Sequence, residues 1–202
     1  MSKMNKKMKT LDPQVIDKFK AILQKSVSLA EEGAYSKAIL LLEETLKEAA
    51  KLSFVQPEID VQNALGILHW KNNSFEKFLE ITATSLANAR VHKYKKGTAE
   101  ALLNLAWVLA MERKDFIKAF DFTEEALAVT QDIGYVKGIA TSLYIISAAY
   151  KYKKMEDKAT YYLDKSLQVS MSLAGESDLL IPSKEGLSEK EKDQLKDALD
   201  LI

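Results

Sequence analysis

The sequence predicts an all-α fold in which four helical hairpins stack into a solenoid. One observation is the pattern of residues 101–129, where apolar side chains recur at steps of three and four, as on one face of a helix. A second is that weaker copies of this pattern precede and follow it at a fixed interval. A third is the placing of the three prolines, because none falls inside a helix that the pattern predicts.

Residues 101–129 predict two antiparallel helices. The apolar and small residues that share a face are Leu102, Leu105, Ala106 and Leu109 in the first helix, and Ala119, Phe122, Thr123, Ala126 and Leu127 in the second. The polar run 112–115 between them is too short for anything but a tight turn between helices. Asp115 is placed to cap the second helix.

The hairpin repeats along the chain. One step of each expected second helix recurs at intervals of 40, 41 and 40 residues: Ala38, Phe78, Ala119 and Ala159. The aromatic residue that ends three of these helices keeps the same interval: Phe54, Tyr94 and Tyr135. The pairs Lys96-Gly97 and Lys137-Gly138 then begin two of the first helices. A fixed period of this length, filled by two helices, indicates stacked repeats rather than a single closed core.

These residues resemble the tetratricopeptide repeat (TPR) family, in its variant with a period near forty residues. The family has a small residue late in the first helix, here Ser26, Gly66, Ala106 and Ser147. It then has Ala, a large residue and Ala in the second helix, here Ala38/Leu42/Thr45, Phe78/Thr82/Ser85, Ala119/Thr123/Ala126 and Ala159/Leu163/Ser166. The resemblance covers about residues 14–174. Phe78 departs from the pattern, and repeat three has one extra residue, which we expect in its turn. The resemblance implies a right-handed α–α superhelix.

The expected repeats are residues 13–54, 57–94, 97–135 and 136–174. Residues 1–12 form a basic tail that we expect to be disordered, and Asp12 and Pro13 start the first helix. Residues 175–187 form a linker before a C-terminal helix, 188–202, which begins with the capping box Ser188 to Glu191. We expect this helix to cover the exposed face of the last repeat. The alternative is that it docks into a groove of its own or of a neighbouring chain.

Composition excludes several classes of function. The 29 basic and 29 acidic side chains cancel, so no global charge indicates binding to nucleic acid or to an anionic membrane. The chain has no cysteine, which removes disulfides and thiolate metal sites. No apolar run approaches the ~18 residues that a membrane span needs. We therefore expect a soluble, cytoplasmic protein.

No catalytic motif is found. His69 and His92 lack a second histidine or a carboxylate at the spacing of metal ligands, and no phosphate-binding glycine loop occurs. We expect no enzyme activity, no cofactor and no metal.

The resemblance implies that the first helices line a concave groove. The residues at groove-facing steps are Asp60, Asn63, Ile67, Trp70 and Lys71 in repeat two, Glu100, Leu103, Asn104, Trp107 and Met111 in repeat three, and Thr141, Tyr144, Ala148, Lys151 and Tyr152 in repeat four. Rigid aromatic side chains are typical of recognition surfaces. For each ring, packing between helices is the alternative. Asn104 sits where related repeats bond the main chain of an extended peptide, and a locally bonded amide is its alternative.

The function that these patterns favour is a non-catalytic scaffold. We expect its groove to bind a peptide or helix of another protein, with apolar side chains and a basic group. The carboxylate clamp of chaperone-binding relatives is disfavoured, because Asp60 and Glu100 lie in the groove. Two alternatives remain open: self-association into a homo-oligomer, and a sensor of signalling peptides.

Overall fold

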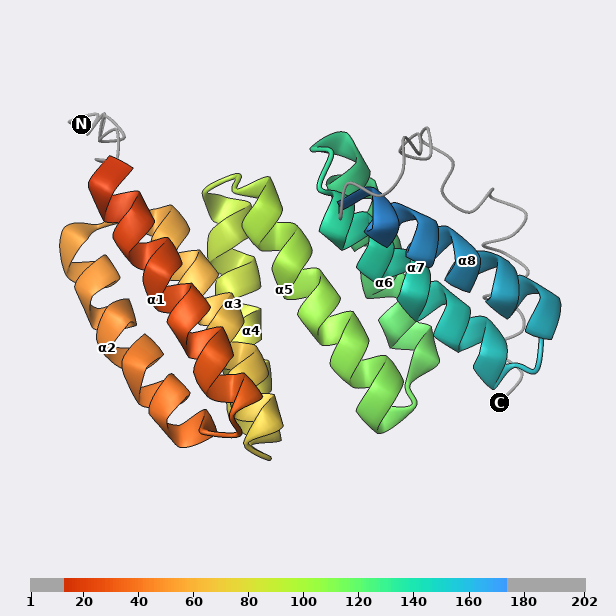
Figure 1. Cartoon of the computed structure of the whole chain (residues 1–202), viewed down its shortest axis with the longest axis horizontal. Helices are drawn as coiled ribbons and strands as arrows, with labels where there is room; N and C mark the ends of the chain where they lie inside the picture. The colour runs from red at the N-terminus through yellow and green to blue at the C-terminus, as the bar shows by residue number, and fades with distance from the viewer. Residues whose placement is uncertain (1–12, 174–202) are drawn as a thin grey trace, which may run out of the picture.

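The computed structural model describes residues 13–173, and within that range every regular element is helical. The elements are α1 (Pro13–Glu31), α2 (Tyr35–Leu52), α3 (Val55–Lys71), α4 (Phe75–Val91), α5 (Lys95–Val108), the π-helical turn η1 (Leu109–Arg113), α6 (Phe116–Asp132), α7 (Val136–Tyr152) and α8 (Glu156–Leu173). The hairpins follow one another along the long axis of the molecule, from α1 at one end to α8 at the other (Figure 1). The predicted all-α solenoid is confirmed. The expected tail, linker and C-terminal helix lie outside the described residues.

Each helix packs against the helix before it and the helix after it in the chain. The first helices of neighbouring hairpins also contact one another: α1 with α3, α3 with α5, and α5 with α7. The buried side chains form two clusters, one around Phe19, Leu42 and Leu65, and a larger one that runs from Phe78 to Tyr150 and beyond. The core therefore extends along the array. Within residues 13–173, no helix combines the length and the hydropathy that a membrane span requires.

The turns share one backbone conformation. Among residues 13–173, seven have a positive φ, between 55° and 74°: Gly33, Asn73, Lys114 and Lys154 inside the hairpins, and Ser53, Lys93 and Gly134 between them. After α3, the Asn73 amide donates to the Trp70 carbonyl (2.9 Å) and the Ser74 amide donates to the His69 carbonyl (2.8 Å). This is the Schellman arrangement, in which a left-handed residue satisfies the last carbonyls of a helix.

Glycine is the residue that this conformation favours, so Lys154→Gly should stabilise the fold by about 0.5 kcal/mol. The gain is small because glycine also increases the conformational entropy of the unfolded chain. Conversely, Gly134→Ala should cost about 1 kcal/mol, since no atom would crowd the new Cβ and only its φ of 64° is unfavourable. Urea denaturation of both variants measures these changes. If both substitutions changed the free energy of unfolding in the same direction and by the same amount, this interpretation of the turns would be wrong.

The extra residue of repeat three lies in a helix, which corrects the prediction that it lengthens the turn. Ser26 and Ala38 are 12 residues apart, whereas their equivalents Ala106 and Ala119 are 13 apart. The π-helical turn Leu109–Arg113 absorbs the added residue, and the turn that follows holds just Lys114 and Asp115. The side chain of Asp115 accepts a hydrogen bond from the Lys118 amide (3.3 Å), so its predicted capping role is confirmed.

Phe78 lies opposite a glycine of the same hairpin. Its side chain is fully buried, and a Cβ added to Gly66 would lie 3.7 Å from the ring and 2.5 Å from the Thr82 hydroxyl. A methyl group at position 66 would therefore clash with Thr82 and only touch the ring of Phe78, so the glycine makes room for Thr82. Pro57 lies inside α3, in its first turn, whereas the sequence predicted that it falls outside the helices. A proline is tolerated there because an amide of the first turn has no hydrogen-bonding partner within the helix.

Candidate functional site

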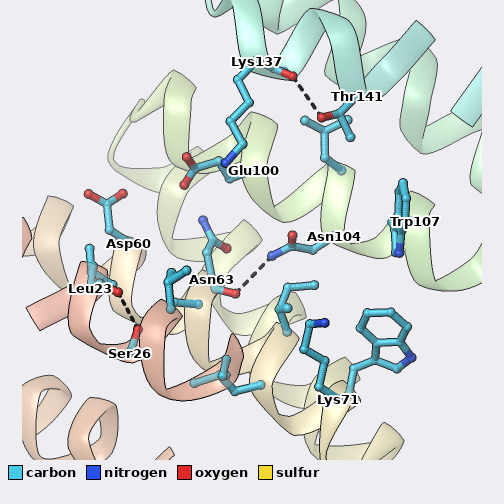
Figure 2. A pocket seen from close by; sticks show the side chains of 18 of the residues that line it. Leu23, Ser26, Asp60, Asn63, Lys71, Glu100, Asn104, Trp107, Lys137 and Thr141 are labelled. Atoms are coloured by element: carbon cyan, nitrogen blue, oxygen red, sulfur yellow. Dashed lines mark hydrogen bonds between the residues drawn. The ribbon is translucent and has the colours of Figure 1, made fainter. Parts of the chain in front are cut away.

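A groove of about 980 Å³ runs across the first helices of the hairpins. Its lining comes from α1, α3, α5 and the first half of α7. Figure 2 shows labelled side chains of three of these helices together: Asp60, Asn63 and Lys71 from α3, Glu100, Asn104 and Trp107 from α5, and Lys137 and Thr141 from α7. Because the repeats place equivalent residues side by side, the groove has a charged end near the helix starts and an aromatic end near their C-termini.

The structure brings together ten of the predicted groove residues. They are Asp60, Asn63, Ile67, Trp70, Lys71, Glu100, Leu103, Asn104, Trp107 and Thr141. The other predicted residues do not line this groove: Met111, Tyr144, Ala148, Lys151 and Tyr152.

Two of these five residues are aromatic and pack between helices. Tyr144 of α7 stacks on Trp107 of α5, with ring centroids 5.5 Å apart, and Tyr152 stacks on Phe116 at 4.4 Å. Met111 lies in η1 against the larger core cluster. Tyr144 thus stacks on a groove residue while its own side chain stays 40% exposed.

An apolar wall occupies the aromatic end of the groove. Its members are Val27, Ile67, Trp70, Leu103 and Trp107, while Leu23 of the same lining lies near Asp60 (Figure 2). Val27 is 56% exposed although it is a large aliphatic residue, and both tryptophans are partly exposed. Trp107 is held by Tyr144, and the Lys71 ammonium lies 5.7 Å from the centre of the Trp70 ring. The wall is therefore an accessible apolar surface with its rings already oriented.

The two asparagines of the groove have different roles. Asn63 is buried, its amide nitrogen donates to the Gly97 carbonyl (3.1 Å), and its amide oxygen accepts from the Ser85 hydroxyl (2.7 Å). Asn104 donates to the Asn63 carbonyl at 3.1 Å (Figure 2). Its amide oxygen accepts no hydrogen bond from residues 13–173. Asn63 thus joins two repeats, while Asn104 keeps an acceptor for a ligand.

At the charged end, a hydrogen bond between an acid and a tyrosine connects the first helix of a repeat to the last residue of that repeat, just before the next first helix begins. The Tyr94 hydroxyl, just before α5, donates to Asp60 of α3 (3.0 Å), and the Tyr135 hydroxyl donates to Glu100 (3.0 Å). We call these two contacts the acid–tyrosine clasps. At the first junction the equivalent aromatic is Phe54, which has no hydroxyl and instead packs edge-on against Phe19.

The two clasps differ in their electrostatics. The Lys96 ammonium lies 3.7 Å from the Glu100 carboxylate, whereas Asp60 forms no ion pair with any described residue. Burial and the nearby charge of Glu100 raise the pKa of Asp60 from 3.8 to about 6, against the opposing effects of Tyr94 and Lys96. Burial, followed by the carboxylates, also raises the pKa of both tyrosines, so they remain donors at neutral pH.

Part of the groove lining was not predicted from the sequence. The missed residues are Leu23, Gln24, Ser26, Val27, Ala30, Glu31, Ala64, Leu68, Lys96, Tyr135, Lys137 and Gly138. The repeat period could have indicated some of them, because Leu23 and Val27 lie one period of 40 residues before Asn63 and Ile67. No such signal marked Lys96 or Tyr135, whose place depends on how one repeat meets the next.

The part of the chain that the structure describes holds no group of three side chains able to bind a metal. His69 is buried outside the groove lining, and burial, followed by Lys77, lowers its pKa, while Glu43 opposes the shift.

No protein-family model matches the sequence, and no curated protein matches it. Among solved structures, the chain is similar to the crystal structure of BtubC (BKLC) from P. vanneervenii. The TM-score is 0.60 and the sequence identity is 18%, over 91% of this chain and 74% of BtubC. At this identity the likeness shows the fold alone, and it supports the all-α solenoid.

Proposed function

We propose that the chain is a non-catalytic interaction module that binds a segment of another protein in this groove. The observation that carries the proposal is the gathering of both tryptophans of the chain on one apolar wall, beside an unused amide acceptor. Aromatic anchors in a preformed pocket contribute most of the binding energy in many interfaces. The resemblance to the tetratricopeptide repeats supports the same role.

The groove also suits a protein segment by its shape and chemistry. About 980 Å³ is at the upper end of small-molecule pockets, and the lining is shared by four helices. Because Trp107 is fixed by Tyr144, little side-chain entropy is lost when a partner covers it. The lining includes no histidine to act as a general base near neutral pH.

Trp107→Ala should weaken binding of a protein segment by roughly ten- to hundredfold, because it removes a central anchor. The full chain, immobilised, would select binders from a displayed library of random peptides, and fluorescence anisotropy would give the affinity of each selected peptide for wild type and variant.

Leu79→Ala is the matched control, since Leu79 is a partly exposed apolar residue of α4 outside the groove lining. It should leave the affinities unchanged. Failure to select any peptide, or equal losses in the two variants, would contradict the proposed function. Circular dichroism of both variants would show that the fold is retained.

A further inference from the structure

We propose that the bound segment is extended and places an arginine or lysine side chain against Asp60, next to an apolar side chain on the apolar wall. This inference rests on the proposed function and deepens it by naming the chemistry of the partner.

The first argument is that Asp60 has unused acceptor capacity. Its carboxylate lines the groove, and its one hydrogen-bonding partner among the described residues is the Tyr94 hydroxyl, at 3.0 and 3.3 Å from the two oxygens. A carboxylate can accept about four hydrogen bonds. The nearest lysine of its own repeat junction, Lys96, pairs with Glu100 instead. A guanidinium or ammonium group is the ligand that fills such a position.

The second argument is electrostatic complementarity. Asp60 is mostly removed from water and feels the negative charge of Glu100, which is why its pKa is raised. A cationic side chain would relieve both effects, whereas an anionic one would add to the repulsion. The lining has three lysines, and each already faces a group of the chain. Lys96 is paired with Glu100, Lys71 lies over Trp70, and Lys137 extends toward Glu100 (Figure 2), so they favour an acidic segment less than their number suggests.

The third argument is spacing. On α5, Glu100, Asn104 and Trp107 follow at four and three residues, so Asn104 lies about 6 Å from the charged row and about 4.5 Å from the aromatic row along the helix axis. The free amide oxygen of Asn104 can accept a backbone N–H of an extended chain. In an extended segment of the polyproline II type, which rises about 3.1 Å per residue and turns once every three residues, side chains about three residues apart lie on the same side, so the basic and the apolar side chains would both face the groove.

The test uses the full chain and the peptides that it selects from the random library. We expect a basic residue about three positions from an apolar one. For one such peptide with arginine, affinities are measured in a double-mutant cycle of Asp60→Asn against arginine→glutamine in the peptide. Each single change should weaken binding by roughly tenfold, and the double change should weaken it little further. Asparagine still accepts the Tyr94 hydrogen bond, so the clasp survives.

Glu80→Gln is the control, because it removes the same charge from an exposed position of α4 outside the groove lining. It should not change the affinity. If the selected peptides lack a basic residue, or if the two changes are additive, the inference is overturned, while a loss on Trp107→Ala would still support the proposed function. If neither Asp60→Asn nor Trp107→Ala weakens binding, or if no peptide is selected, both are overturned.

Discussion

Replacing Gly97 with alanine should lower the free energy of unfolding by about 2 to 3 kcal/mol. The added Cβ would lie 2.6 Å from Cγ2 of Ile59 and 2.6 Å from Cδ1 of Tyr94, closer than carbon atoms can approach. Neither neighbour can move easily, because Ile59 is buried and Tyr94 is held by its clasp with Asp60. The start of α5 would have to shift away from α3.

Urea denaturation, followed by circular dichroism, measures this change. The control is Gly33→Ala, where no atom lies within 4 Å of the added Cβ and the φ of 74° alone is unfavourable. That variant should lose about 1 kcal/mol. If Gly97→Ala lowered the free energy of unfolding no more than Gly33→Ala does, the close packing of Gly97 against Ile59 and Tyr94 would be contradicted.

Asp60→Asn should raise the free energy of unfolding at pH 7 by about 1 to 3 kcal/mol. The folded chain binds the Asp60 proton more tightly than the unfolded chain, because the pKa rises from 3.8 to about 6 on folding. The fold therefore tolerates the protonated, neutral form of Asp60. The contribution of this protonation to the free energy of unfolding is fully present below pH 3.8 and is lost as the pH rises through about 6. Above that pH the ionised carboxylate destabilises the fold, and asparagine removes this cost.

Denaturation at a series of pH values tests the sign. The stability of the variant minus that of wild type should be largest at pH 7 and should approach zero near pH 4. His69 acts in the opposite direction, since its lowered pKa makes the fold lose stability as the pH falls below about 6.5. It is present in both proteins, so the subtraction removes its effect. A difference that does not vary with pH would contradict the assignment to Asp60.

The denaturation and the peptide-binding experiments with Asp60→Asn should give opposite results, so an effect on folding can be told apart from an effect on binding. The same substitution should make the free chain more stable and its complex weaker. A residue that costs stability where a partner is expected is typical of a binding site, because natural folds seldom reach their stability optimum at functional positions.

Much of the fold could be predicted from the sequence because the repeat period identifies equivalent positions in successive hairpins. Ala38, Phe78, Ala119 and Ala159 marked equivalent steps, and all four are buried in α2, α4, α6 and α8. The place of the extra residue in repeat three could not be predicted. A period counts residues, and the same count is satisfied by a longer loop or by a wider helical turn such as Leu109–Arg113.

The site was predicted in part, for a similar reason. Helical periodicity fixes which residues of one helix share a face, and the resemblance to tetratricopeptide repeats indicated that the face with Asn104 and Trp107 lines the groove. It does not fix how neighbouring helices are rotated, and this rotation decides that Tyr144 stacks on Trp107 and is not part of the groove lining. The clasp between Tyr94 and Asp60 joins residues 34 positions apart, at the two ends of one repeat, so no local sequence pattern indicated it.

Tryptophan fluorescence tests the central claim most directly, because Trp70 and Trp107 are the two tryptophans of the chain and both line the groove. A selected peptide at saturating concentration should shift their emission to shorter wavelength and protect them from acrylamide quenching. The Leu79→Ala control should behave as wild type does. A peptide that binds with full affinity by anisotropy yet leaves the emission and the quenching unchanged would place the binding site elsewhere on the solenoid.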